Sequence, residues 1–165
     1  MKISRGVQKK IFSKETVTSL IVIFFIFIFD RVTKIAIINH QSSNQSIFVN
    51  DYLNFELIWN TGVAFGLFSQ NVNTYYYLIS LLIFAVIIFI VYLITKVEFQ
   101  EKILFSLILG GAIGNLYDRL IYLAVPDFID FHINNFHWFT FNIADIFITL
   151  GIILILTKDL ISKKK

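Results

Sequence analysis

Four apolar segments dominate this sequence of 165 residues and limit the folds that it can adopt. They cover residues 17–38, 75–94, 103–122 and 139–157. A helix of about 20 apolar residues crosses the hydrocarbon core of a bilayer. Because backbone polar groups in lipid must be satisfied within the segment, we predict that each is a transmembrane helix. We therefore expect a single domain over residues 1–165, an all-α integral membrane protein with four spans.

The positive charges indicate the orientation of these spans. Lysine and arginine are absent from two connectors, residues 39–74 and 123–138, and occur in the N-terminal segment, the middle connector and the C-terminal segment. Cytoplasmic loops of membrane proteins are enriched in these residues. The pattern predicts that both termini and the middle connector are cytoplasmic, and that the two uncharged connectors lie on the outer side.

Composition excludes several other classes of protein. With 57% hydrophobic and 15% charged residues, the chain is too apolar for a soluble domain of this length. The net charge of +3 arises mainly beside the spans, so we expect contact with membrane lipid and no nucleic-acid partner. The absence of cysteine excludes disulfides and thiol chemistry. His40, His132 and His137 match no metal-binding spacing, so we expect neither a metal nor a cofactor.

The outer connectors are predicted to carry a small β-element. Residues 52–59 alternate in part between apolar and polar side chains, which is typical of a half-buried strand. Residues 128–133 and 136–141 are rich in aromatic and β-branched side chains and are separated by Asn134 and Asn135, which favours a hairpin. Aromatic side chains at this depth are also typical of membrane-interface anchors, so this alternative stays open.

Polar residues occur inside the predicted spans, where an ionisable group costs at least about 2.5 kcal/mol. On the first, third and fourth spans they share one helix face: Asp30, Thr33 and Lys34; Asn115, Asp118 and Arg119; Asn142 and Asp145. In the predicted orientation all of them lie near outer helix ends, at the level of Asn60 and Asp127 in the outer connectors. We expect these residues to converge at the outer boundary between membrane and water.

Ion pairing would explain some of these residues. Lys34 follows Asp30 by four positions, which favours an ion pair within one helix. Asp118 and Arg119 are typical of a charge pair at a helix end. We therefore predict structural roles for both pairs.

Capping and close packing would explain others. Asn142 is a typical helix N-cap, and Asp145 at the third helical position suits the positive end of the helix dipole. Gly110 and Gly114 form a Gly-xxx-Gly pair, which predicts that the third helix approaches a neighbour closely.

Asp127 and Asp145 differ from the other acids because no cationic residue adjoins either of them in the sequence. Two carboxyl groups held close together cannot easily both ionise, so one keeps its proton. In aspartic proteolysis the ionised group takes a proton from the attacking water, and the protonated group donates to the carbonyl oxygen. Composition and spacing alone do not select these two residues.

The ordered motifs of the chain resemble those of the bacterial lipoprotein signal peptidases, also called signal peptidase II. Five motifs carry the resemblance: Asp-Arg-Val-Thr-Lys at 30–34, Asn-Thr-Gly-Val-Ala-Phe at 60–65, Gly-Ala-Ile-Gly-Asn-Leu-Tyr-Asp-Arg at 111–119, Val-Pro-Asp-Phe-Ile at 125–129 and Phe-Asn-Ile-Ala-Asp at 141–145. Each motif is modest alone, but five in order on four spans are a specific signal.

The resemblance implies an aspartic-type endopeptidase of the bacterial cytoplasmic (inner) membrane, with its active site facing the outer side and Asp127 and Asp145 as catalytic residues. It implies supporting roles in substrate binding or orientation of the dyad for seven positions: Asp30, Lys34, Asn60, Gly111, Asn115, Arg119 and Asn142. The implied substrate is a diacylglyceryl-modified prolipoprotein, cut on the amino side of the lipidated cysteine. We expect the enzyme to act as a monomer.

Two residues depart from the family pattern. Leu123 stands where the family usually has glycine, and Pro126 stands where an aliphatic residue is more common. Proline lacks a backbone donor and restrains the residue before it, so we expect the segment that presents Asp127 to be shaped differently.

Three other interpretations stay open. Lys34 could act as the base for a nucleophilic serine, Ser46 or Ser69, although Asp30 should keep Lys34 charged. The acids could instead form an ion or proton pathway, which predicts acidic residues at several depths rather than at one. A purely structural membrane subunit is the third interpretation, and the convergence of polar residues counts against it.

Overall fold

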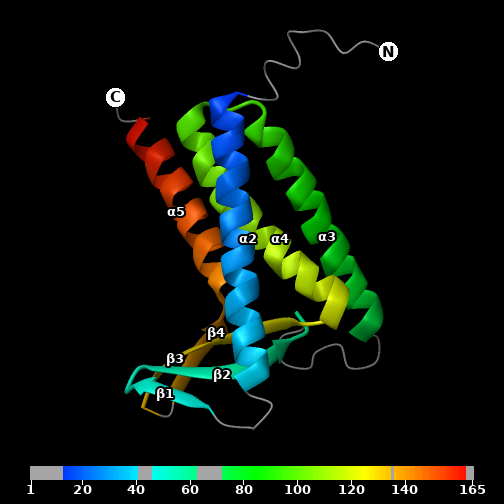
Figure 1. The fold of residues 1–165 in the computed structure, drawn as a ribbon, viewed down its shortest axis with the longest axis vertical. Coiled ribbons are helices and arrows are strands. Elements are labelled where there is room, and N and C mark those ends of the chain that lie inside the picture. Colours follow the sequence, from blue (N-terminus) through cyan, green and yellow to red (C-terminus); the bar gives the residue numbers. More distant parts are fainter. Residues whose placement is uncertain (1–12, 41–45, 63–71, 135, 163–165) are drawn as a thin grey trace.

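The computed structural model describes residues 13–40, 46–62, 72–134 and 136–162. In these ranges a group of helices packs lengthwise, and one antiparallel sheet lies across one end of it (Figure 1). The helices are α2 (Lys14–His40), α3 (Val72–Ile94), α4 (Phe99–Tyr122) and α5 (Ile143–Ser162). The strands are β1 (Ile47–Asn50), β2 (Leu53–Asn60), β3 (Val125–Ile133) and β4 (Phe136–Phe141).

The helices follow the predicted spans, with one correction. Among the described residues, α3 and α4 are long and apolar enough to cross a membrane. The span predicted at 139–157 begins too early, because residues 139–141 belong to β4 and α5 starts at Ile143. A capping box sets this boundary: the Asp145 backbone N–H donates to Asn142 Oδ1 at 3.1 Å, and the Asn142 N–H donates to Asp145 Oδ2 at 3.2 Å. The predicted cap is therefore confirmed.

Glycines allow α4 to pack closely against two neighbouring helices. A Cβ atom on Gly110 would lie 2.9 Å from the Cβ of Ile26 in α2, and Gly114 faces α2 as well. A Cβ atom on Gly111 would lie only 2.5 Å from the Ala144 carbonyl oxygen of α5. The predicted close approach at the Gly-xxx-Gly pair is confirmed, and it brings α2 and α5 onto the same part of α4.

The two long connectors form a single sheet with the strand order β1-β2-β3-β4. The predicted strand at 52–59 corresponds to β2, and the predicted hairpin corresponds to β3 and β4. β1 was not predicted, nor was the pairing of β2 with β3, which joins the two connectors. Hence the β-element is larger than the one expected beside four helices.

An apolar cluster fixes the sheet against the end of α2. Ile37 of α2 is buried together with Phe128 and Ile129 of β3. Phe55 of β2 meets Phe128 edge to face, with ring centroids 6.1 Å apart. These contacts hold β3 over the helix ends and so determine where Asp127 lies.

Candidate active site

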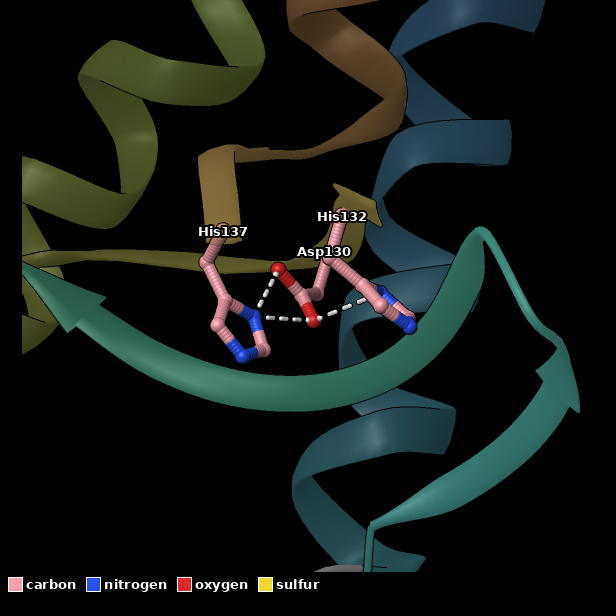
Figure 2. Close-up of side chains that lie close together, drawn as sticks. All are labelled: Asp130, His132 and His137. Atoms are coloured by element: carbon pink, nitrogen blue, oxygen red, sulfur yellow. Dashed lines mark hydrogen bonds and ion pairs between the residues drawn. The ribbon is translucent and has the colours of Figure 1, made fainter. Parts of the chain in front are cut away.

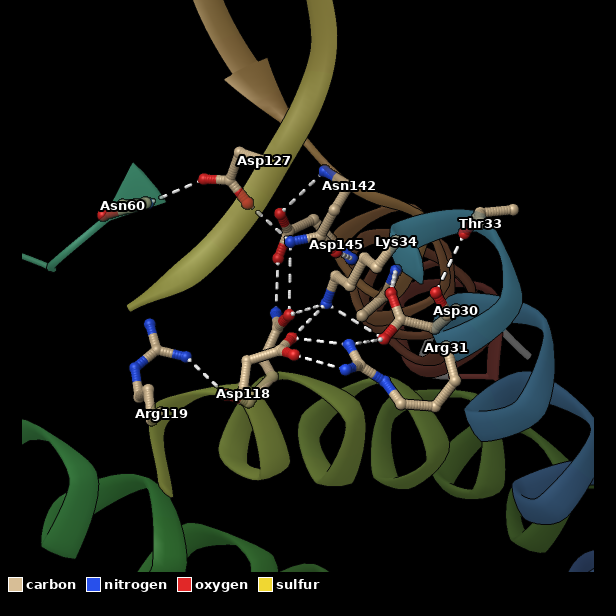
Figure 3. Close-up of polar contacts among 12 residues, drawn as sticks. Asp30, Arg31, Thr33, Lys34, Asn60, Asp118, Arg119, Asp127, Asn142 and Asp145 are labelled. Atoms are coloured by element: carbon tan, nitrogen blue, oxygen red, sulfur yellow. Dashed lines mark hydrogen bonds and ion pairs between the residues drawn. The ribbon is translucent and has the colours of Figure 1, made fainter. Parts of the chain in front are cut away.

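Polar side chains from three helices and two strands meet where the sheet joins the helices (Figure 3). Asp30 and Lys34 come from α2, Asn115 and Asp118 from α4, and Asn60 and Asp127 from β2 and β3. Asn142 and Asp145 lie at the start of α5. The predicted convergence of these distant residues is confirmed.

Four charged side chains, which we call the ion cluster, join α2 to α4: Asp30, Arg31, Lys34 and Asp118. Lys34 Nζ donates to Asp30 at 2.9 Å, to Asp118 at 2.7 Å and to Asn115 Oδ1 at 2.8 Å. Arg31 donates to the same two carboxylates, at 3.0 and 2.7 Å. With two cations and two anions the cluster is neutral, which allows the side chains of Asp30, Lys34 and Asp118 to be fully buried.

The ion cluster argues against the interpretation in which Lys34 is a base. All three ammonium donors of Lys34 are used, in bonds to two carboxylates and one amide oxygen. A charged ammonium has no lone pair with which to activate a hydroxyl. Ser46 is exposed beside β1, and Ser69 lies outside the described residues. The contacts of Lys34 therefore indicate a structural role.

The predicted pairing of charges is right for one pair and wrong for the other. The ion pair between Asp30 and Lys34 is confirmed. Asp118 pairs with cations of α2 instead of Arg119, because consecutive helical residues point in different directions. Arg119 Nη1 donates to the Asn115 carbonyl at 3.1 Å, and its positive charge acts on the acids of the neighbouring network.

Arg31 is a site residue that the spacing argument missed. Its guanidinium carbon lies 5.0 Å from the centre of the Tyr117 ring, in addition to its bonds with Asp30 and Asp118. A cation within an apolar segment was the signal that could have identified it. Thr33 shares the predicted face but stays outside the network, since its hydroxyl donates to carbonyls of its own helix.

Asp127 and Asp145 are joined through asparagine amides, and we call this group the amide–carboxylate network. Asp127 Oδ2 accepts from Asn60 Nδ2 at 2.8 Å, and Asp127 Oδ1 accepts from Asn142 Nδ2 at 2.6 Å. Asp145 Oδ1 accepts from Asn115 Nδ2 at 2.8 Å, and Asp145 Oδ2 accepts from the Asn142 backbone N–H. Asn142 therefore contacts both carboxyl groups.

The surroundings of Asp127 favour its protonated form. Burial raises the pKa of this carboxyl from its ordinary value to about 6. The hydrogen bonds from Asn60 and Asn142 oppose the rise, and the negative charge of Asp145 adds to it. Asp127 therefore holds a proton at a pH where an exposed aspartate is ionised.

Asp30 connects the ion cluster to the start of α5. Its Oδ1 accepts a hydrogen bond from the Ala144 backbone N–H at 3.0 Å, while its Oδ2 binds Arg31 and Lys34. Ala144 precedes Asp145, so this contact fixes the first turn of α5. The close packing of Gly111 against Ala144 has the same effect from the side of α4.

The structure places Leu123 at the end of α4 and Pro126 in β3. Leu123 caps α4 in the left-handed conformation, with φ of 56° and ψ of 21°, which glycine adopts without strain. Pro126 lies opposite Trp59 of β2, in the part of β3 that precedes its pairing with β4.

An apolar groove of about 460 Å³ opens beside Asp145. It is lined by residues of β4 and α5: Phe139, Phe141, Asp145, Ile146, Thr149, Leu150 and Ile153. A groove with one acidic residue among mainly apolar side chains suits an apolar segment that presents a single polar bond.

Comparison with known proteins relates this geometry to a family. The sequence profile described as signal peptidase (SPase) II matches residues 22–161. The lipoprotein signal peptidase of Pelagibacter ubique (strain HTCC1062) is 44% identical over 160 residues, which cover 96% of each protein. That of Anaplasma phagocytophilum (strain HZ) is 36% identical over 152 residues, which cover 89% of this chain and 94% of the relative.

Solved structures extend the similarity to the fold. A bacterial membrane enzyme determined by the in meso method at 1.9 Å resolution is 34% identical, with a TM-score of 0.74 over 87% of this chain and 92% of its own. Another, at 2.3 Å resolution, is 33% identical, with a TM-score of 0.69 over 90% and 92% of the two chains.

Proposed function

Because the chain belongs to the signal peptidase II family of aspartic-type proteases, we propose that it removes signal peptides from diacylglyceryl-modified prolipoproteins. The bond hydrolysed is the one on the amino side of the lipidated cysteine. The observation that carries this proposal is the placement of Asp127 and Asp145, which share Asn142 and lie beside an apolar groove. No cofactor is needed for this chemistry.

The proposed reaction assigns a separate role to each aspartate. Asp145 takes a proton from water as the water oxygen attacks the carbonyl carbon of the scissile bond, and Asp127 donates its proton to the carbonyl oxygen. When the tetrahedral intermediate collapses, Asp145 gives the proton that it took from water to the departing cysteine nitrogen, and Asp127 recovers a proton from a hydroxyl of the intermediate. The products are a signal peptide with a free carboxyl group and a lipoprotein with a free amine. The raised pKa of Asp127 supports this assignment.

The polar residues around the two aspartates are proposed to position them or the substrate. Asn60, Asn115 and Asn142 hold the carboxyl groups through amide donors. Arg119 supplies positive charge near both acids. The ion cluster and Gly111 act indirectly, by fixing α2, α4 and α5 relative to one another.

The substrate would lie with its apolar signal segment in the groove beside Asp145. Phe139 and Phe141 of β4 and Ile146 and Leu150 of α5 provide an apolar surface there. The lipidated cysteine would be held at the membrane surface by its diacylglyceryl group, which brings the scissile bond to the level of the aspartates.

We propose that all four helices cross the inner membrane and that the sheet lies on its outer face. The start of α2, the connection from α3 to α4 and the end of α5 all lie at the end opposite the sheet (Figure 1). Lys14, Lys96, Lys102 and Lys158 are at that end, which supports a cytoplasmic location. The charges inside α2 are buried in the ion cluster and are not presented to lipid.

Exposed apolar side chains support the proposed contact with membrane lipid, and the site residues support the proposed monomer. α2 exposes Phe24 and Phe25, and α3 exposes Leu81 and Leu82, each with more than 60% of its surface accessible. All the residues of the amide–carboxylate network come from one chain, so a monomer of one domain suffices for catalysis.

The test is cleavage of a diacylglyceryl-modified prolipoprotein peptide by the purified protein. We expect cleavage by the wild type and by Asp51→Asn, a control in the exposed turn between β1 and β2, and none by Asp127→Asn or Asp145→Asn. Asparagine keeps the size of the side chain but cannot exchange the proton. Thermal unfolding in detergent checks that all variants are folded.

Other outcomes would point to other classes of protein. Cleavage by both asparagine variants would rule out the aspartyl mechanism. An inactive wild type that conducts ions across proteoliposomes without substrate would favour an ion pathway.

A further inference from the structure

Asp130, His132 and His137 form a second cluster of titratable side chains on the sheet (Figure 2). His137 Nδ1 lies 2.9 and 2.8 Å from the two carboxylate oxygens of Asp130, and His132 Nδ1 lies 3.3 Å from Asp130 Oδ2. One ligand atom from each residue lies within 4.8 Å of the other two. The cluster shares no residue with the amide–carboxylate network.

Strand pairing creates this cluster from residues whose sequence spacing matches no metal motif. His132 on β3 and His137 on β4 are direct partners across the hairpin. Their rings stack with centroids 5.2 Å apart. Asp130 precedes His132 by two residues, so both side chains leave β3 on the same face. A His132 backbone N–H bond to the Tyr52 carbonyl, at 3.0 Å, fixes the strand on its other side.

The donor set and its spacing suit a transition-metal ion. Two imidazole nitrogens and one carboxylate oxygen are ligands that Zn²⁺ and neighbouring divalent ions accept. With bonds of about 2.0–2.2 Å, the ligand atoms of a tetrahedral site lie about 3.3 Å apart. The contacts of Asp130 Oδ2 with His132 and His137, at 3.3 and 2.8 Å, are close to that spacing.

His132 supplies an independent indication that a ligand belongs here. Apart from the 3.3 Å ion-pair contact with Asp130, its buried Nδ1 makes no hydrogen bond among the described residues, and the residue is only 8% exposed. A buried polar atom without a hydrogen bond is unfavourable, and a metal bond would satisfy it. The His137 side chain is 56% exposed, so an ion can reach the cluster from solvent.

We propose that Asp130, His132 and His137 bind one divalent transition-metal ion of the Zn²⁺ class. Each imidazole binds the ion through Nδ1 and keeps its proton on Nε2, and the carboxylate of Asp130 offsets part of the positive charge. The ion cross-links β3 and β4 near their turn, which stabilises the hairpin between Asp127 and Asn142. Three protein ligands leave a further coordination position for water.

The test is zinc binding by the full-length protein, purified in detergent without a polyhistidine tag and stripped with a chelator. After dialysis against Zn²⁺ alone, we expect one equivalent of zinc on the wild type and on His40→Ala, which removes the third histidine of the chain. We expect at least tenfold weaker binding by His132→Ala and by His137→Ala. With Co²⁺ as the probe, the wild type should show visible absorption that both variants lack.

Thermal unfolding separates loss of the site from loss of the fold. Because His137 is largely exposed, His137→Ala should unfold like the wild type without metal, and Zn²⁺ should raise the midpoint of the wild type only. Absence of stoichiometric binding by the wild type would overturn the proposal and leave an Asp130–histidine ion pair as the role of the cluster. Equal binding by the wild type and both histidine variants, or binding that depends on Asp127 instead, would also overturn it.

Discussion

Asn142 contacts both carboxyl groups of the amide–carboxylate network. Its Nδ2 donates to Asp127 and to Asn115 Oδ1, at 2.6 and 3.2 Å, and its Oδ1 accepts from the Asp145 backbone N–H. The residue therefore caps α5 and links both carboxyl groups at once. These two roles explain why both the helix-capping pattern and the family motif indicate Asn142.

Asn60 offers a test of the role given to Asp127. Its amide stabilises the Asp127 carboxylate, so Asn60→Ala should raise the pKa of Asp127 further above 6. If Asp127 acts in its protonated form, the alkaline limb of kcat/KM should move to higher pH by about one unit. The measurement is the pH profile of kcat/KM on a lipidated peptide.

A matched control for this pH profile is Asn50→Ala. Asn50 accepts a bond from the Tyr52 backbone N–H in the turn between β1 and β2 and does not contact Asp127. Asn50→Ala should therefore leave the alkaline limb of the kcat/KM profile at the same pH. An acid limb that moves to higher pH in Asn60→Ala, with the alkaline limb in place, would assign the protonated role to the other aspartate.

At the scale of single elements, the end of α4 carries a strained residue. Leu123 adopts the left-handed conformation and is 53% exposed, so glycine would relieve strain at little loss of burial. We expect Leu123→Gly to raise the free energy of unfolding by about 1 kcal/mol. The same change at Leu120, which is 67% exposed within the helix, should lower it by about 1 kcal/mol.

Equilibrium unfolding in detergent would measure both leucine variants. Opposite signs at two exposed leucines of one helix would show that backbone conformation, and not lost apolar contact, decides the effect. A destabilised Leu123→Gly would mean that the side chain makes an important contact in the membrane.

Two salt bridges between α2 and α4 should differ strongly in their contribution to stability. Asp118 pairs with fully buried Lys34, so Asp118→Asn leaves buried positive charge uncompensated and should cost about 3 kcal/mol. Glu15 pairs with Lys102 at 2.8 Å, but its side chain is 49% exposed, and Glu15→Gln should cost less than about 1 kcal/mol. The measurement is unfolding in detergent at one ionic strength. Equal losses of stability in the two variants would contradict the larger contribution expected from the ion cluster.

For the whole molecule, the absence of native cysteine makes the orientation in the membrane easy to test. Asp51 in the turn of β1 and β2 and Lys96 between α3 and α4 are both exposed. With a membrane-impermeant maleimide on intact inner-membrane preparations of known sidedness, Asp51→Cys should react from the outer side and Lys96→Cys from the cytoplasmic side. Reaction of both from one side would contradict the proposed topology.

Most of the elements, and the identity of the motif residues, could be predicted from the sequence. Hydrophobic length predicted four helices, partial alternation predicted β2, and two asparagines between aromatic runs predicted the hairpin of β3 and β4. These properties are local, because a helix face or a strand face is set by the spacing of neighbouring residues. The five motifs, read in order, predicted which family the chain belongs to.

Which side chains meet depends on the packing of the helices and the register of the strands. Asp118 could have paired with its neighbour Arg119, but the packing of α4 on α2 gave it Lys34 and Arg31 instead. The pairing of β2 with β3 made one sheet of two connectors, and the register of β3 and β4 placed His132 opposite His137. Partners of this kind depend on how helices pack and strands align over long separations, which local spacing does not encode.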